Sequence, residues 1–316
     1  MIMKKTLCLI IAGIAINACA QVEPPKHDWN VTLKVVDEAG RSVTAAKTQV
    51  FYLLTNVITG FTDTNGIFTA SHQDGSENLA FQIETPGYYS SLMPYHMGRN
   101  YKPEIWNPMQ TIVLKIIGKP IPMYARKTQI EIPALNEPIG FDLIAGDWVA
   151  PYGKGKQSDF IFEAQRRWAS RNDFDSTVKL TFSNAGNGMV PVSVPLNQGS
   201  QLRLSATAPS EGYIPEFIKS LSHTPANGWK DNEREGNKEQ NYYFRVRTVL
   251  DEQGSVKSAL YGKIHGDFAL DPINSKTTWI LFIYYLNPEP NSRNVEFDPK
   301  RNLIENLKPD EAVSAP

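Results

Sequence analysis

The sequence predicts an all-β protein, and three observations support this. Short stretches alternate apolar and polar residues with a period of two, as in Trp29 to Val35, which is typical of strands with one buried face. The 316 residues include 22 prolines, which suits short strands joined by turns. The apolar run Trp279 to Leu286 is too short for a helix and indicates a strand covered on both faces. At this length we expect two domains, a small β-sandwich followed by a larger β-rich domain.

Residues 1–20 have the pattern of an export signal. Lys4 and Lys5 precede an apolar run from Leu7 to Ile16, which is shorter than the roughly 20 residues that cross a bilayer. We therefore expect an exported protein in the periplasm, at the cell surface or outside the cell.

The end of this leader leaves two interpretations open. Ala18-Cys19-Ala20 fits the small residues that signal peptidase prefers, whereas residues 16–19 resemble a lipobox in which Cys19 would carry a lipid, although Asn17 departs from that pattern. The processed chain would then begin at Gln21 or at Cys19. A lipid anchor at Cys19 is the only membrane attachment that we expect.

Composition excludes several classes of protein. Both cysteines, Cys8 and Cys19, lie in the leader, so the processed chain has no disulfide. Removing Lys4 and Lys5 from the 32 basic residues leaves 30 against 33 acidic ones, with both signs interspersed. This pattern contains no basic stripe for nucleic acid, and we expect no nucleic-acid partner.

The first domain is predicted from a series of strand and turn signals. The turn Asp37 to Gly40 follows the first strand, and an apolar run begins at Val50. Asn65-Gly66 supplies a tight turn before Ile67, and Leu79, Phe81 and Ile83 alternate again.

Two of these segments carry a resemblance to a known family. Val35 to Gly40 reads V-x-D-x-x-G and Thr62 to Phe68 reads T-D-x-x-G-x-F, with Pro86-Gly87-Tyr88-Tyr89 after the last strand. Residues 28–118 thus resemble the carboxypeptidase regulatory-like modules of the transthyretin-like, or prealbumin-like, β-sandwich group. The resemblance implies a β-sandwich and a secreted context, and it implies no chemistry, because members of the group share none.

The boundary between the domains is predicted near Lys119. A last strand is expected from Thr111 to Ile117, and Pro120 and Pro122 stiffen the linker that follows. The long stretch from Tyr88 to Pro108 is expected to be a loop that packs against the second domain, with a functional loop as the alternative.

The second domain, residues 121–307, is also predicted to be β. Residues 242–264 indicate a hairpin that turns at Asp251 to Gly254, and Trp279 to Leu286 is expected at the centre of the core. The pattern from Phe160 to Arg171 fits a strand or a helix. The tail, residues 308–316, has no apolar pattern and is expected to be disordered.

Motifs for catalysis and for metals do not emerge. None of the five histidines has a glutamate three residues later, so the zinc site of a carboxypeptidase is absent from the sequence. Ser176 and Lys179 match Ser-x-x-Lys but would lie on opposite faces of a strand. The glycine and lysine residues from Tyr152 to Ser158 lack the first glycine of a phosphate loop. We expect no cofactor and no metal.

One segment, Phe141 to Lys156, carries a candidate ligand site. It combines aromatic rings with carboxylates and amines among glycines, a composition that suits sugars. The competing interpretation places the rings in the core and the lysines on a solvated turn. The candidate ligand-binding residues are Trp148, Tyr152, Asp142, Asp147, Lys154 and Lys156.

These observations favour a non-enzymatic binding or structural module of a bacterial envelope, with an envelope polysaccharide or a protein as its partner. Two alternatives remain open. One is a glycan-binding protein that uses the segment Asp142 to Lys156. The other is a hydrolase, which would need Asp142, Asp147 and Asp159 to meet in one pocket.

Overall fold

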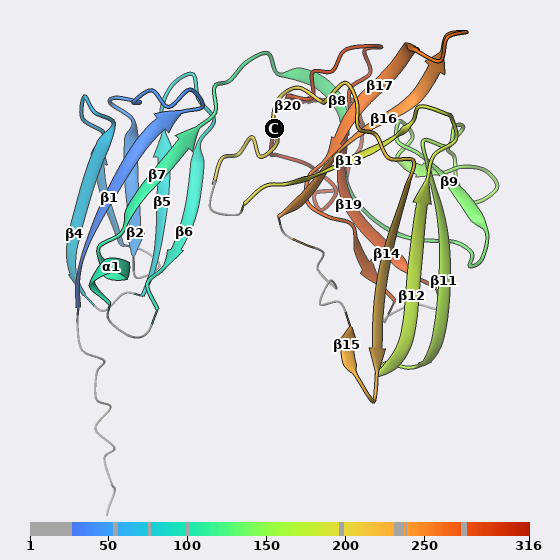
Figure 1. The fold of residues 1–316 in the computed structure, drawn as a ribbon, viewed down its shortest axis with the longest axis horizontal. Helices are drawn as coiled ribbons and strands as arrows, with labels where there is room; N and C mark the ends of the chain where they lie inside the picture. The colour runs from blue at the N-terminus through green and yellow to red at the C-terminus, as the bar shows by residue number, and fades with distance from the viewer. Residues whose placement is uncertain are drawn as a thin grey trace, which may run out of the picture.

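The computed structural model describes residues 27–52, 56–74, 77–98, 102–195, 199–230, 237, 239–272 and 277–316. The leader, with the two interpretations of Cys19, lies outside the described residues. The chain is all-β, as predicted, and its strands form two separate pairs of sheets (Figure 1). We call the part with β1 to β7 the first unit and the part with β8 to β20 the second unit.

The first unit is a sandwich of two sheets. One sheet has the order β4-β1-β7, in which β1 pairs antiparallel with β4 and parallel with β7, and the other has the order β3-β2-β5-β6. Alternating side chains such as Leu33, Phe81 and Leu114 fill the space between the sheets. The elements are β1 (His27–Asp37), β2 (Lys47–Tyr52), β3 (Asn56–Phe61), β4 (Ile67–Asp74), β5 (Asn78–Glu84), β6 (Ser91–His96), α1 (Pro103–Trp106) and β7 (Met109–Leu114).

The stretch from Tyr88 to Pro108 is not the loop that we expected. It contains β6, which completes the second sheet, and α1, whose Trp106 is 1% exposed in the core of this unit. A proline at the first position favours the start of α1. The tryptophan at the end of α1 is buried, so this aromatic side chain serves packing.

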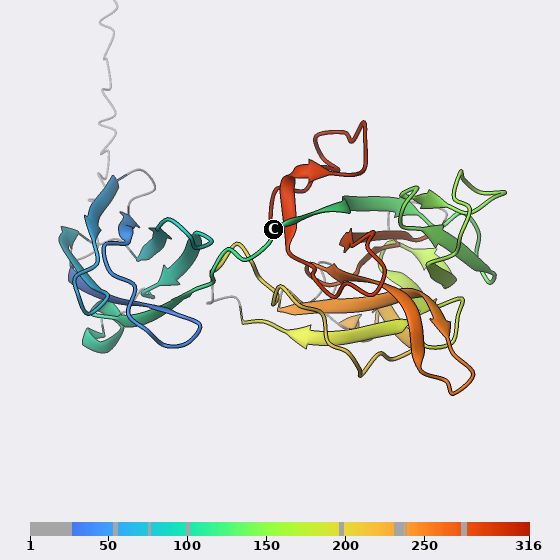
Figure 2. The ribbon, with the colours of Figure 1, turned by 90° about the horizontal axis from the view of Figure 1, so that it is seen from above.

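The second unit is a larger sandwich. Its sheets have the orders β10-β9-β11-β12-β14-β15 and β13-β16-β17-β19-β8-β20, with β18 beside β19. Figures 1 and 2 show these sheets away from the first unit, with the C-terminal end beside β20. The strands are β8 (Ile121–Glu131), β9 (Pro138–Asp142), β10 (Asp147–Trp148), β11 (Phe160–Ser170), β12 (Asp173–Thr181), β13 (Gly188–Ser193), β14 (Glu216–Thr224), β15 (Gly228–Lys230), β16 (Gln240–Leu250), β17 (Val256–Ile264), β18 (Ala269–Asp271), β19 (Trp279–Leu286) and β20 (Phe297–Asn302).

Strand β19 is an interior strand with both faces covered, as its continuous apolar run predicts. Tyr284 belongs to the core between the sheets, and the next residue, Tyr285, belongs to a second cluster on the outer face. The predicted hairpin is β16 and β17, and the ambiguous segment after Phe160 is strand β11.

The tail is ordered, which corrects the expectation of disorder for residues 308–316. The backbone N–H of Lys127 donates to the carbonyl oxygen of Glu311, and Arg126 lies 2.7 Å from the Glu311 carboxylate. Val313 packs against the outer cluster of the second unit. These partners lie far away in sequence, so the composition of the tail contains no sign of them.

Candidate functional site

Trp148 is a core residue, which corrects its prediction as an exposed stacking residue. Its side chain is 4% exposed, and its ring makes edge contacts with Phe141 and Phe162 at centroid distances of 5.3 and 5.8 Å. The indole Nε1 donates to the carbonyl oxygen of Glu131 at 3.0 Å. A ring with its polar atom satisfied inside a core offers no face to a ligand.

Tyr152 remains on the surface, with its side chain 43% exposed. Its hydroxyl donates to the carboxylate of Glu137, and this hydrogen bond raises the pKa of Tyr152. Lys154 and Lys156 are exposed in the same segment. The structure thus leaves one exposed ring near two amines in place of the expected pair of rings.

Asp142 organises the turn that follows β9. Burial alone would raise the pKa of Asp142, but backbone N–H donors outweigh this effect and lower it. The segment returns so closely that a Cβ on Gly155 would lie 2.9 Å from the Cβ of Asp142, so glycine is required there. The carboxylate accepts hydrogen bonds from the backbone N–H groups of Ile144, Ala145, Lys156 and Gln157 at 2.9 to 3.2 Å.

Asp147 is the cross-strand partner of Asp142 in the pairing of β10 with β9, but its carboxylate binds other groups. Its Oδ1 accepts from the backbone N–H of Trp148 at 2.8 Å, and its Oδ2 accepts from that of Lys154 at 2.9 Å. This carboxylate therefore shapes the short turn after β10, and within the described residues no hydrogen bond links it to the carboxylate of Asp142 or Asp159.

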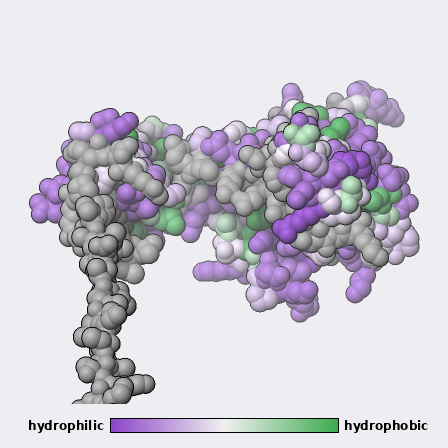
Figure 3. Space-filling model, turned by 90° about the horizontal axis from the view of Figure 1, so that it is seen from below, coloured by the Kyte–Doolittle hydropathy of each residue, from purple (hydrophilic) through white to green (hydrophobic). Residues whose placement is uncertain are grey.

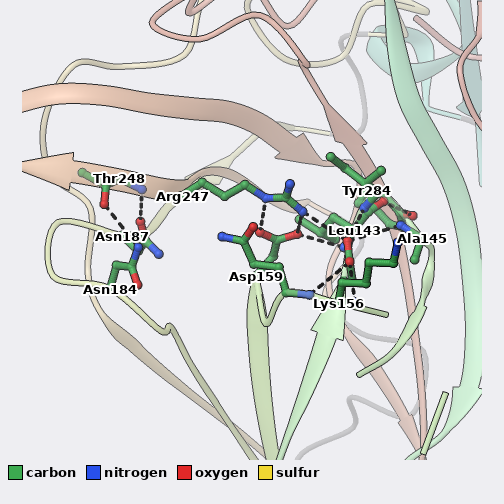
Figure 4. Close-up of polar contacts among 12 residues, drawn as sticks. Leu143, Ala145, Lys156, Asp159, Asn184, Asn187, Arg247, Thr248 and Tyr284 are labelled. Atoms are coloured by element: carbon green, nitrogen blue, oxygen red, sulfur yellow. Dashed lines mark hydrogen bonds and ion pairs between the residues drawn. The ribbon is translucent and has the colours of Figure 1, made fainter. Parts of the chain in front are cut away.

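Asp142 and Asp159 meet at Arg247, and we call these three residues the aspartate–arginine cluster. Figure 4 shows Asp159 facing Arg247. The guanidinium Nε and Nη2 of Arg247 donate to the two carboxylate oxygens of Asp159, each at 2.8 Å. Nη2 also lies 3.1 Å from Asp142, and the backbone N–H of Leu143 donates to Asp159 at 3.0 Å.

The charges of this cluster are strongly coupled. Burial raises the pKa of Asp159 against the opposing effect of Arg247, and the hydrogen bonds to Asp159 raise the pKa of Arg247. Every carboxylate oxygen of Asp142 and Asp159 already accepts at least one hydrogen bond. The geometry fits a structural ion pair that locks the turn against the opposite sheet.

Arg247 is the residue that sequence reasoning missed. Strict alternation along β16 would place Arg247 on the same face as Arg245, whose guanidinium stacks over Tyr213. Instead the register with β17 shifts between Val246 and Val249, and Arg247 adopts a φ of 54°. Such a bulge re-aims a side chain. The only signal in the sequence is a second arginine, two residues after Arg245, in a strand with a mostly apolar middle.

Neither a metal site nor a membrane span is found in the described part of the chain. There, no group of three or more histidine, cysteine, aspartate or glutamate side chains is placed to hold a metal ion. No helix among these residues is long and apolar enough to cross a bilayer.

A second buried carboxylate, Glu296, connects the two units. It precedes β20 in the second unit and is 2% exposed. Its Oε1 accepts from the Tyr89 hydroxyl and from the backbone N–H of Gly118, both at 2.8 Å, and its Oε2 accepts from the N–H of Lys119 at 2.7 Å. A Cβ on Gly118 would lie 2.8 Å from Oε2, so this close approach requires glycine.

Backbone pairing adds to this connection. Residues 90–92, at the start of β6, pair with residues 199–201 of the second unit. The N–H of Leu92 donates to Gly199 and the N–H of Gln201 donates to Ser90, both at 2.9 Å. We call this pairing, together with Glu296 and its three donors, the interunit joint. The start of the stretch Tyr88 to Pro108 therefore packs against the second unit, as expected, whereas Trp106 packs in the core of the first unit.

Lys263 lies close to the joint but has no direct partner there. It is 2% exposed, and its Nζ lies 4.8 Å from the ring centroid of Tyr285. Within the described residues its Nζ has no hydrogen-bond partner. Burial lowers the pKa of Lys263 to about 7, although the negative charge of Glu296 acts in the opposite direction. Burial likewise lowers the pKa of His265 to about 4.

Comparison with known proteins does not show a family for this chain. No family model and no curated protein matches it. A 3-chlorocatechol 1,2-dioxygenase from Rhodococcus opacus is 14% identical over 31% of this chain and 62% of its own, with a TM-score of 0.24. The chain thus spans less than two thirds of that enzyme.

Two other solved structures cover more of the chain. The shaft pilin SpaA from Lactobacillus rhamnosus is 11% identical over 71% of this chain and 89% of its own, with a TM-score of 0.25. A DUF3823 family protein from Bacteroides ovatus is 11% identical over 75% and 95%, with a TM-score of 0.21. These scores carry no argument about function. The first unit is a β-sandwich, as the sequence resemblance implies, but membership of the carboxypeptidase regulatory-like group is not shown.

Proposed function

We propose that this protein is an exported, non-enzymatic envelope module that holds two β-sandwiches in a fixed relative orientation. The interunit joint is the observation that carries the proposal. A buried carboxylate with three donors from the first unit and its linker, together with a β-bridge of two backbone hydrogen bonds, restrains both rotation and separation of the units. Units joined only by a flexible linker would have neither feature.

The aspartate–arginine cluster supports the non-enzymatic part. A hydrolase needs carboxylates that are free to exchange protons with a substrate. Here the oxygens of Asp142 and Asp159 accept hydrogen bonds from the backbone and from Arg247. On the face that Figure 3 shows, hydrophilic residues prevail and apolar residues form small groups, which suits a module in aqueous surroundings.

Small-angle X-ray scattering of the processed protein tests the fixed orientation. The proposal expects that a single arrangement of the two units fits the whole curve. A curve that requires an ensemble of separated units would contradict it.

Export is tested separately by cell fractionation and by the intact mass of the native protein. The mass also distinguishes a chain that begins at Gln21 from one that begins at a lipidated Cys19. An unprocessed form in the cytosol would contradict export.

Glycan binding is a second proposal, and the exposed ring of Tyr152 is the observation that favours it. Lys154 and Lys156 could contribute hydrogen bonds, whereas the buried Trp148 could not stack on a sugar. Pull-down with insoluble envelope polysaccharide should retain the wild-type protein and lose the Tyr152→Ala variant. Phe61→Ala is the matched control, because Phe61 is an exposed ring in the first unit. Equal retention of all three proteins would contradict the proposal.

A further inference from the structure

An apolar cavity lies between the two sheets of the second unit and is separate from the joint and from the aspartate–arginine cluster. Its volume is about 180 Å³. Both sheets contribute to its wall, β11, β12 and β14 from one side and β16 and β19 from the other. The lining includes Phe162, Leu180, Phe217, Tyr242, Phe268 and Ile280.

The polar atoms of the lining are already paired. The Nζ of Lys219 lies 2.5 Å from Asp267, and the Tyr242 hydroxyl donates to the same carboxylate at 2.6 Å. A water molecule in such a site needs two to four polar partners, which these residues do not offer. The positive charge of Lys219 is neutralised by Asp267, so an anion gains little there.

The cavity has an exposed apolar rim. Pro191 on β13 and Phe217 on β14 both line it, and Pro191 is exposed whereas Phe217 is half-buried. Phe217 and Tyr242 make an edge contact with their ring centroids 5.7 Å apart. An incoming ring would therefore meet aromatic side chains at the wall.

Size and chemistry together define the ligand. An apolar protein cavity of about 150 Å³ is large enough to stay dry and to bind benzene. We propose that this cavity is a binding site for a small uncharged apolar molecule, with a group the size of a benzene ring. Its buried surface would drive binding, and its lack of charge would match the paired polar groups at the wall.

Benzene is the probe for the first test, with methyl NMR spectra of the processed protein as the readout. The methyl groups of Leu180 and Ile280 should shift saturably on titration, while those of Val31 and Leu33 in the core of the first unit should not. Benzoate, which has the same ring and a negative charge, should bind at least tenfold more weakly. Absence of saturable shifts at Leu180 and Ile280, or equal binding of benzoate, would overturn the proposal.

Two variants locate the site. Val178 lines the cavity and is 3% exposed, so Val178→Phe should fill the space and abolish the benzene shifts. Pro191→Asp places a carboxylate at the exposed rim and should weaken binding at least tenfold. Val249→Asp is the matched control, because Val249 is 52% exposed in the same unit and does not line the cavity. If Val178→Phe does not fold, Pro191→Asp decides, and unchanged affinity in that variant would overturn the proposal.

Discussion

The aspartate–arginine cluster and the interunit joint both centre on buried carboxylates, but they neutralise them differently. Asp142 and Asp159 face the guanidinium of Arg247 directly, at 3.1 and 2.8 Å. Among the described residues, the donors to the Glu296 carboxylate are neutral, namely two backbone N–H groups and a tyrosine hydroxyl. The cluster connects the two sheets of one sandwich, whereas the joint connects two sandwiches.

This difference indicates how each site responds to change. A buried ion pair is strongly coupled, so the loss of one partner leaves the other charge unpaired at large cost. A carboxylate held by neutral donors leaves no unpaired opposite charge behind when its own charge is removed. We therefore expect the cluster to determine stability and the joint to determine orientation.

The largest effect is expected at Arg247. Arg247→Met should lower the free energy of unfolding by about 3 to 5 kcal/mol, because it leaves Asp159 buried without its cation. Urea denaturation measures the change. The double variant Arg247→Met with Asp159→Asn should recover part of the loss. A change below about 1 kcal/mol for Arg247→Met alone would show that the pair does not stabilise the fold.

The second largest loss of stability is expected for Trp148→Ala. Trp148→Ala should cost about 3 to 5 kcal/mol, since the ring fills the core between the sheets and its Nε1 is satisfied by Glu131. Urea denaturation again gives the value. If the variant kept wild-type stability and instead lost affinity for a polysaccharide, Trp148 would be an exposed binding residue and not part of the core.

A substitution of Lys263 should raise the stability of the fold instead of lowering it. Lys263→Met should raise stability by about 1 to 3 kcal/mol near pH 7, because it removes a buried ammonium group without a hydrogen-bond partner in the described residues. Lys257→Met, an exposed lysine of the same strand, is the matched control and should change stability little. A destabilised Lys263→Met would mean that the amine has a favourable role near Glu296.

The pH dependence of stability follows from the ionisation of Lys263. The pKa of Lys263 is about 7 in the folded protein and 10.5 when exposed, so the unfolded chain binds more protons between these values. The stability of the wild type should therefore rise from about pH 7 to pH 9, by up to about 1.4 kcal/mol per pH unit. Thermal melts should show this slope, and it should flatten in Lys263→Met. The same slope in both proteins would assign it to other groups.

The smallest effect is expected at Tyr152. Tyr152→Ala should change stability by less than about 1 kcal/mol, because the side chain is 43% exposed and its hydrogen bond to Glu137 lies at the surface. Chemical denaturation beside Trp148→Ala gives the contrast within one segment. A loss as large as that of Trp148→Ala would mean that Tyr152 belongs to the core.

The sequence predicted the parts of the fold that depend on local periodicity. Trp279 to Leu286 is interior strand β19, and the turn at Asp251 joins β16 to β17, because apolar alternation and turn chemistry act over a few residues. Local periodicity did not predict whether an aromatic ring is exposed or buried. Composition gave Trp148 and Tyr152 the same role, and only packing against Phe141 and Phe162 separates them.

The remaining features depend on contacts between distant segments. Arg247 reaches Asp159 because a bulge breaks the alternation of β16, and period-two reasoning has no means to predict the bulge. Glu311 orders the tail through Arg126, which lies 185 residues away. Glu296 and Gly118 are similarly separated by 178 residues, so the joint is not visible in either segment alone.

Fixed orientation of the units is tested most directly by the distance between spin labels on exposed residues of each unit. The processed chain contains no cysteine if it begins at Gln21, so Lys34→Cys and Asp175→Cys provide two unique sites on β1 and β12. We expect a single narrow distance distribution in the wild type, a broad one in Glu296→Gln, and a narrow one in the exposed control Glu289→Gln. A broad distribution in the wild type, or no broadening in Glu296→Gln, would contradict the account.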